Sequence, residues 1–166
     1  MQTLEALLAG SKFFQGLQPE HLQLIAGCGS NMQFEPGTYL FHEGDPSDRF
    51  YLINRGTVAL EVASPGHGAL TVSTLGEDEL IGWSWLVPPY RTQSDARAIE
   101  PTRATSFDGA CIRMKCEEDP RLGYALLKRF AQLIERRLQD AQQQLLVIHG
   151  TPIRDRAPRG SRPVAF

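Results

Sequence analysis

The stretch PGTYLFHEGDPSDRFYLINRGTVAL, residues 36–60, alternates short apolar runs with glycine, proline, aspartate and asparagine. Runs rich in β-branched and aromatic residues that are bounded by such turn residues are typical of short β-strands. From Thr57 to Val62 a large apolar residue occupies every second position, which predicts a strand with one buried face and with Glu61 on the outward face. The stretch therefore predicts a β-rich core.

Similar runs extend this core toward the carboxyl end of the chain. Further strands are expected at residues 69–75, 95–99 and 102–107, and the stretch SPGHG, residues 64–68, has the composition of a hairpin tip. The spacing of these turns is typical of a β-sandwich or a barrel.

Helices are expected on both sides of the core. Apolar residues in the first 28 positions have helical spacing, and Pro19 stands at the start of the second of two short runs. A long helix is predicted from Pro120, capped by Asp119, to about Ile148. At about 1.5 Å per residue it would span roughly 40 Å, so part of it is expected to project from the domain.

The long helix carries a heptad pattern. Steps of four and three residues repeat without a miss in a seam formed by Leu127, Ala131, Ile134, Leu138, Ala141, Leu145 and Ile148. Such a seam favours a parallel or near-parallel homodimer, and the alternative is an amphipathic helix that lies on its own domain. A second stripe is expected to pack on the β core and consists of Leu122, Leu126, Phe130 and Leu133.

Length and composition narrow the possible functions. The chain has 166 residues, of which 42% are hydrophobic and 22% charged, as in a single globular domain. We place this domain at residues 1–150, followed by a basic, proline-rich and disordered tail at 151–166. The net charge of −2 offers no broad basic surface for nucleic acid. The sequence shows neither a signal peptide nor a membrane-spanning run, so the cytoplasm is the expected compartment.

The cysteines give no sign of a metal or catalytic centre. Cys28, Cys111 and Cys116 cannot all pair within one chain, and without a secretion signal they are expected to be reduced thiols with a packing role. Their spacing lacks the close pairs of a zinc or iron–sulfur site, and the four histidines are scattered. The stretch DGACIRMKCEEDP, residues 108–120, contains no recognisable nucleophile-and-base motif. We therefore expect no metal, no cofactor and no enzymatic activity.

An ordered set of turn glycines and strand residues lies within the opening stretch and consists of Gly37, Gly44, Asp45, Tyr51, Ile53, Gly56 and Val58. Together with the long heptad helix, this set resembles the sensor domain of the catabolite activator and related cyclic-nucleotide-binding proteins, the Crp/Fnr-like family. The resemblance covers roughly Phe14 to Ile148. It implies a double-stranded, jelly-roll-like β-roll of about eight strands, with short N-terminal helices and a long C-terminal helix that dimerises.

In that family a phosphate-binding cassette, a short helix followed by a loop, holds the ligand. The segment IGWSWLVPPYRTQ, residues 81–93, resembles this cassette, and the pair Arg91 and Thr92 is similar to the family's Arg-Ser/Thr pair, which binds the cyclic phosphate. The resemblance implies a cyclic nucleotide, cyclic AMP or cyclic GMP, or a related anion as ligand. It would be bound by Ile81, Gly82, Trp83, Ser84, Trp85, Leu86, Arg91, Thr92 and Gln93.

The segment departs from the family pattern in three respects, of which the simplest is that Gln93 replaces the usual alanine. Trp83 stands where the family has a glutamate that accepts hydrogen bonds from the ribose 2′-hydroxyl, and an indole has one N–H donor and no acceptor. Loss of that hydrogen bond is expected to cost about 1 to 3 kcal/mol of binding free energy. Counting back from Ala96–Ala98 puts Thr92 at the family's arginine position, so Arg91 requires a one-residue insertion or bulge to reach it. Both tryptophans and Tyr90 can stack on a base, fill the pocket or pack in the core.

The resemblance implies a stand-alone regulatory sensor: a homodimer that binds a small anionic ligand and signals through its helices to a protein partner. The family's transcription factors carry a helix-turn-helix domain after the long helix. Residues 151–166 are too few and too rich in proline for it, so direct DNA binding by that route is not expected. The alternative is a ligand-free accessory subunit with a degenerate nucleotide pocket.

Overall fold

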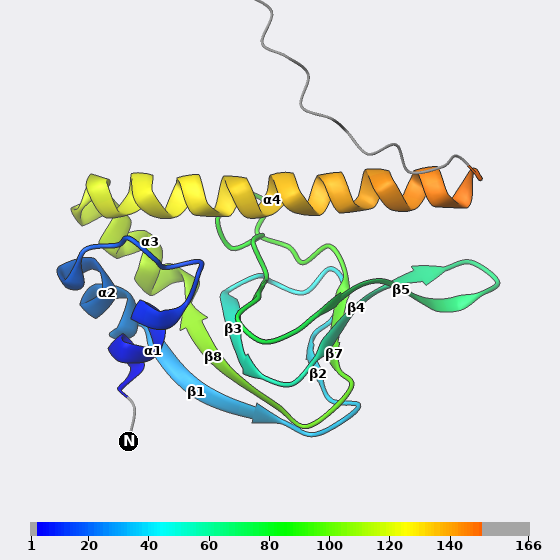
Figure 1. Cartoon of the computed structure of the whole chain (residues 1–166), viewed down its shortest axis with the longest axis horizontal. Coiled ribbons are helices and arrows are strands. Elements are labelled where there is room, and N and C mark those ends of the chain that lie inside the picture. Colours follow the sequence, from blue (N-terminus) through cyan, green and yellow to red (C-terminus); the bar gives the residue numbers. More distant parts are fainter. Residues whose placement is uncertain (1–2, 151–166) are drawn as a thin grey trace, which may run out of the picture. The chain divides into compact units, whose positions relative to one another are not determined.

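The computed structural model describes residues 3–150 (Figure 1), in which two helices precede eight strands along the chain and two helices follow them. None of the helices in this range is both long and apolar enough to cross a membrane. The helices are α1 (Leu4–Gly10), α2 (Pro19–Ala26), α3 (Gly109–Glu118) and α4 (Pro120–Ile148). The strands are β1 (Gly29–Phe34), β2 (Tyr39–Phe41), β3 (Arg49–Arg55), β4 (Val58–Ser64), β5 (Gly68–Leu75), β6 (Leu80–Ile81), β7 (Asp95–Ala98) and β8 (Thr102–Asp108).

The strands form two antiparallel four-stranded sheets, in the orders β1-β8-β3-β6 and β2-β7-β4-β5. This arrangement confirms the predicted β-roll with flanking helices. The β4–β5 hairpin closes where Ser64 pairs with Gly68, so SPGHG forms its tip as expected.

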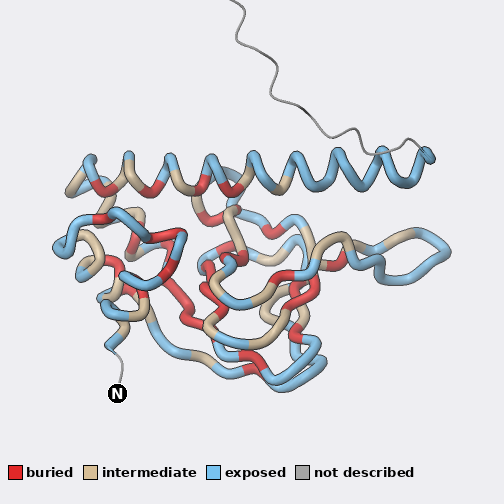
Figure 2. The backbone as a smooth tube through the Cα atoms, viewed as in Figure 1, coloured by how far each residue is buried: buried red, intermediate tan, exposed pale blue. Residues whose placement is uncertain are grey.

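Buried hydrophobic residues of the strands form one cluster, and buried stretches of the chain are red in Figure 2. Both sheets contribute to it, because its members are Phe34, Tyr51, Ile53, Val58, Leu75, Ile81, Ala96, Ala98 and Ala104. Alternate residues of a strand point to opposite faces, so these positions define the inner face of each sheet. This cluster is called the roll interior below.

A second, aromatic cluster joins the helices to the outer face of β3 and β8. The rings of Phe50 and Phe107 stack with centroids 4.8 Å apart, and Phe130 of α4 makes edge contacts with Phe13 at 4.9 Å and with Phe50 at 5.3 Å. Aromatic pairs with these separations stabilise a core beyond the area that they bury. The buried position of Phe130 confirms that the second stripe of α4 packs on the β core.

Helix α4 begins and ends where the sequence predicts. The Asp119 carboxylate accepts a hydrogen bond from the backbone N–H of Arg121 at 3.0 Å, and Pro120 occupies the first helical position. The chain divides into two compact units within this helix, at Ala131 and Gln132. The predicted tail lies outside the described residues, and the domain limit at residue 150 stays a prediction.

Glu61 corrects the expectation that the outward face of β4 is exposed to solvent. The pairing between β4 and β5 shifts register between Leu60 and Glu61, and Glu61 is only 4% exposed. Its carboxylate pairs with the Arg97 guanidinium at 2.5 Å. The extra residue of this shift lies in β5, whereas β4 pairs with β7 without a shift. Glu61 therefore lies on the face opposite to Val58, as the alternation predicts, but it is covered there instead of facing solvent.

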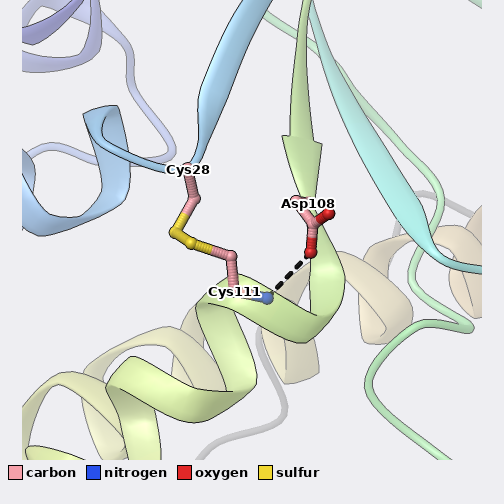
Figure 3. The surroundings of a disulfide bond; sticks show 3 residues. All are labelled: Cys28, Asp108 and Cys111. Carbon is pink, nitrogen blue, oxygen red and sulfur yellow. Dashed lines mark hydrogen bonds between the residues drawn. A yellow bond between two sulfur atoms is a disulfide. The ribbon is translucent and has the colours of Figure 1, made fainter.

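Two cysteines correct the expectation of three reduced thiols. Cys28 and Cys111 form a disulfide with their Cα atoms 5.8 Å apart (Figure 3). The β1–β8 pairing brings them together, because the Asp108 N–H donates to the Cys28 carbonyl at 3.0 Å and α3 begins directly after Asp108. A separation of 83 residues leaves no local signal of this contact in the sequence. Cys116 is a free thiol whose pKa is raised, chiefly by burial.

Candidate functional site

The cassette, residues 81–93, leaves the first sheet at Gly82. Ile81 pairs with Tyr51 of β3 and belongs to the roll interior, and Gly82 then turns the chain with φ +87°. A Cβ at Gly82 would also lie 3.3 Å from the Arg49 carbonyl oxygen. Side chains disfavour this φ and this close approach, so glycine is required where the cassette begins.

The middle of the cassette consists of turns rather than the short helix that the family resemblance implies. The Leu86 N–H donates to the Trp83 carbonyl at 3.2 Å, and the Tyr90 N–H donates to the Val87 carbonyl at 3.0 Å. Pro88 and Pro89, joined by a cis peptide bond, are the two central residues of the second turn. Without a helix here, the cassette does not present the helical N-terminus that usually favours a phosphate.

The two tryptophans have different environments. Trp85 is fully buried in the aromatic cluster, where its ring stacks on Phe50 at 5.0 Å and meets the edge of Phe130 at 5.2 Å. Its indole N–H has no hydrogen-bond partner among the described residues. Trp83 is half-buried, and Ser84 between them is buried. Trp85 is therefore a core residue, whereas Trp83 remains accessible to a ligand.

The cassette ends beside the loop that precedes β3, and there Arg91 and Thr92 face different ways. Thr92 is buried, and its hydroxyl donates to the His42 carbonyl at 2.5 Å. Arg91 and Gln93 are exposed, and the Arg91 guanidinium donates to the Gly44 carbonyl at 3.1 Å. The inward position belongs to Thr92, which is the residue that counting back from Ala96–Ala98 selects.

Two polar side chains lie buried near the cassette. The Ser47 N–H donates to the Tyr90 carbonyl at 2.7 Å, and the Ser47 hydroxyl, also buried, has no hydrogen-bond partner among residues 3–150. Tyr51 in the roll interior has a raised pKa because burial disfavours its charged form. The site therefore combines an apolar interior with a few hydroxyl groups at its edge.

One side chain in contact with the cassette was missed by the sequence reasoning. Arg113 of α3 donates from its guanidinium to the Trp85 carbonyl and lies over the Tyr90 ring, 4.8 Å from the ring centroid. The family motif includes no position on this helix, and only the packing of α3 against the cassette reveals the contact. Within the described range, no group of three His, Cys, Asp or Glu side chains could hold a metal ion.

Comparison with known proteins identifies the family. The family model described as a cyclic nucleotide-binding domain matches residues 31–119, more than half of the chain. A CRP-like cAMP-activated global transcriptional regulator from Mycobacterium tuberculosis is 26% identical over 133 residues, which cover 80% of this chain and 59% of that protein. The cyclic AMP receptor protein from Thermus thermophilus is 27% identical over 149 residues, covering 90% of this chain and 67% of that protein.

A solved cyclic nucleotide-binding domain from Methylobacillus flagellatus has the same fold. Its TM-score is 0.75 at 22% identity, over 89% of this chain and 82% of that one. This chain spans about three fifths of the length of the mycobacterial regulator that it matches. The receptor and the regulator are regulatory proteins rather than enzymes. The β-roll, the position of the cassette and these matches together show that the chain belongs to the cyclic nucleotide-binding domain family.

Proposed function

We propose that this chain is the sensor part of a regulatory protein and that its cassette binds a cyclic nucleotide or a related small anion. The observation that carries the proposal is the place of the cassette in the fold. It connects β6 of one sheet to β7 of the other, and both Ile81 at its start and Ala96, three residues after its end, belong to the roll interior. A base would contact this apolar interior, and a phosphate would meet the polar groups of the cassette.

The expected affinity for an ordinary cyclic nucleotide is reduced. Trp83 offers no acceptor to a ribose 2′-hydroxyl, and the missing hydrogen bond corresponds to roughly one to two orders of magnitude in affinity. The Arg91 guanidinium would have to exchange the Gly44 carbonyl for the phosphate. Since the guanidinium is exposed, this exchange requires no change in the fold.

The signal would leave the domain through α4. Leu138 and Leu145 of the predicted seam are 57% and 56% exposed in the single chain, and a row of exposed leucines is typical of an interface. We infer a homodimer along this seam, with a protein partner that distinguishes its ligand-bound from its ligand-free helices. The cytoplasm remains the compartment that we propose.

Calorimetric titration with cyclic AMP and cyclic GMP tests the function. Wild type is expected to bind one of them saturably, and Arg91→Ala to lose at least about tenfold in affinity, because a charge-assisted phosphate contact disappears. Arg55→Ala, an exposed arginine at the far end of β3, is the matched control and should bind as wild type does. Absence of heat from folded wild-type protein with either nucleotide would refute the proposal for these ligands.

Trp83→Glu tests the ribose contact separately. The variant restores an acceptor at the cassette, so it should bind cyclic AMP more tightly than wild type does. It should gain nothing with 2′-deoxy cyclic AMP, which lacks the hydroxyl. Equal gains with both nucleotides would show that Trp83 does not stand at the ribose.

A second function is favoured by the directions of Arg91 and Thr92. The Arg91 side chain is exposed, the Thr92 hydroxyl donates to the backbone, and Phe41 stacks on Tyr51 at 6.4 Å within the roll. These contacts suit a ligand-free accessory domain that assembles through α4. In that case the protein would be a dimer in solution and would show no heat with either nucleotide.

A further inference from the structure

Arg113 connects α3 to both of the turns in the middle of the cassette. Its guanidinium donates to the carbonyl of Trp85, within the first turn, and covers the ring of Tyr90, the last residue of the second turn. A cation over a tyrosine ring adds an attraction to the hydrogen bond. One side chain therefore restrains residues 85–90 from both sides.

Tyr90 is a position where such restraint matters. Its φ of +54° lies in the left-handed region, which residues other than glycine adopt at a cost. Its carbonyl accepts from the Ser47 N–H at 2.7 Å, and its ring lies under Arg113. Loss of Arg113 would leave this unfavourable backbone conformation with less support.

The helix that carries Arg113 is itself tied to β1. Cys111 lies in its first turn and is bonded to Cys28, and the Asp108 carboxylate caps the same turn by accepting from the Cys111 N–H at 2.8 Å (Figure 3). Each residue of an α-helix is rotated by about 100° from the one before it, so the side chains of Cys111 and Arg113 point in nearly opposite directions. The disulfide therefore holds one face of α3 while Arg113 extends from the opposite face.

We propose that Arg113 is a positioning residue for the cassette and that the Cys28–Cys111 disulfide, by fixing the start of α3, makes ligand binding depend on thiol redox state. The part of this proposal that concerns a ligand rests on the proposed function above. The cassette's conformation depends on Arg113 and the disulfide whether or not a ligand is present.

Opening the bond requires a dithiol reductant. The S–S bond breaks, the two sulfurs take up two electrons and two protons to become the Cys28 and Cys111 thiols, and the dithiol is oxidised to a cyclic disulfide. In the cytoplasm such reductants are present, whereas in an oxidising compartment the bond persists. The free thiol of Cys116 has a raised pKa, so at neutral pH little of it is the thiolate that could exchange with the pair.

Reduction is expected to loosen the cassette without unfolding the roll. The Asp108 cap and the hydrogen bond from the Gly109 N–H to the Asp48 carbonyl, at 2.8 Å, remain when the sulfurs separate. The start of α3 then keeps its place less firmly, and Arg113 spends less time on Trp85 and Tyr90. Because the loosened cassette must become ordered again when a ligand binds, reduction should weaken ligand affinity by about three- to tenfold.

Amide hydrogen exchange of residues 82–93 in the ligand-free protein is the first test. Exchange should be faster in Arg113→Ala and in wild type reduced with dithiothreitol, while strands β4 and β5 exchange as before. Arg113→Lys keeps a cation near Tyr90 and should restore part of the protection, which a general loss of stability would not predict. Unchanged exchange of the cassette in either Arg113→Ala or the reduced protein overturns the proposal.

Cys116→Ser is the matched control, because it removes a thiol that is not in the disulfide. It should respond to dithiothreitol as wild type does, whereas Cys28→Ala/Cys111→Ala should show the loosened cassette with or without reductant. A double variant that exchanges like oxidised wild type would contradict the role of the disulfide.

Titration with cyclic AMP under oxidising and reducing conditions tests the link to affinity. Wild type is expected to bind about three- to tenfold more weakly after reduction. The affinity of the double cysteine variant should not change on reduction. If wild type binds and reduction leaves the affinity unchanged, the redox link is wrong. If wild type does not bind at all, the proposed function fails for this ligand, and the exchange experiment still decides whether Arg113 and the disulfide hold the cassette.

Discussion

Glu61 and Arg97 form an ion pair between β4 and β7 in which the carboxylate side chain is 5% exposed and the guanidinium side chain 34% exposed. The Arg97 Nε–H also donates to the same carboxylate at 3.2 Å, and this hydrogen bond raises the pKa of Arg97. Water can therefore solvate the Arg97 guanidinium if Glu61 is removed, but it cannot easily solvate the Glu61 carboxylate if Arg97 is removed. Removing the exposed member leaves a buried charge, which is the costlier loss.

This asymmetry gives the first prediction. Arg97→Ala should lower the midpoint of thermal unfolding more than Glu61→Gln, since only the former leaves the Glu61 carboxylate without its cation. Adding Glu61→Gln to Arg97→Ala should raise the midpoint again. Differential scanning calorimetry of the three variants decides the matter, and equal losses in both single variants would show that burial of Glu61 does not control the pair.

Trp85 should be a major contributor to stability rather than to binding. Trp85→Ala is expected to lower the free energy of unfolding by about 3 to 5 kcal/mol, because it removes a fully buried ring between Phe50 and Phe130. Trp85→Phe should cost less than about 1.5 kcal/mol, since it keeps a ring and removes the unpartnered indole N–H. Urea unfolding followed by circular dichroism measures both. Trp83→Ala, at the half-buried neighbour, serves as the control, and a loss there equal to that of Trp85→Ala would argue against this assignment.

Asp119 should make stability depend on acid. The 2.9 Å hydrogen bond with His21 lowers the pKa of the Asp119 carboxyl below its ordinary value of 3.8. A carboxyl whose pKa is lower in the folded state contributes stability above its unfolded pKa and loses it as the pH falls through the folded pKa. The advantage of wild type over Asp119→Asn in thermal midpoint should therefore be full above about pH 4 and shrink below it. Asp140→Asn, on the exposed surface of α4, should show no such pH-dependent difference, and an advantage that does not change with pH would contradict the role of ionised Asp119.

The seam on α4 makes a prediction about oligomeric state. Leu138→Glu should convert a dimer to a monomer, because a carboxylate would have to be buried between the helices. Leu70→Glu is the matched control, since Leu70 is 55% exposed on β5 and lies outside the seam. Sedimentation velocity measures both variants. A monomeric wild type, or a dimer that persists in Leu138→Glu, would show that the seam is not a dimer interface.

Local signals in the sequence predicted the features that local interactions determine. The start of α4 followed from Asp119 and Pro120, because a helix cap and its first residue are neighbours in sequence. Features that depend on contacts between distant segments did not follow.

The two corrections are of this second kind. The burial of Glu61 involves its ion pair with Arg97 of the neighbouring strand β7, and the Cys28–Cys111 bond depends on the pairing of β1 with β8. Arg113 was missed for the same reason, since its partners in the cassette lie more than twenty residues away. A single sequence does not indicate which of its distant residues are in contact in the folded protein.

The aromatic cluster has a consequence for where this domain starts. The family match begins at residue 31, yet Phe13 and Phe14 supply rings to the cluster, and the Arg129 guanidinium donates to the Phe13 carbonyl at 2.9 Å and to the Gln15 carbonyl at 2.7 Å. A fragment cut at the family boundary would expose Phe130 and leave Arg129 without these two acceptors. The smallest autonomous folding unit therefore extends upstream of the family match, and an inventory of domains drawn from that match alone would place the first residue too late.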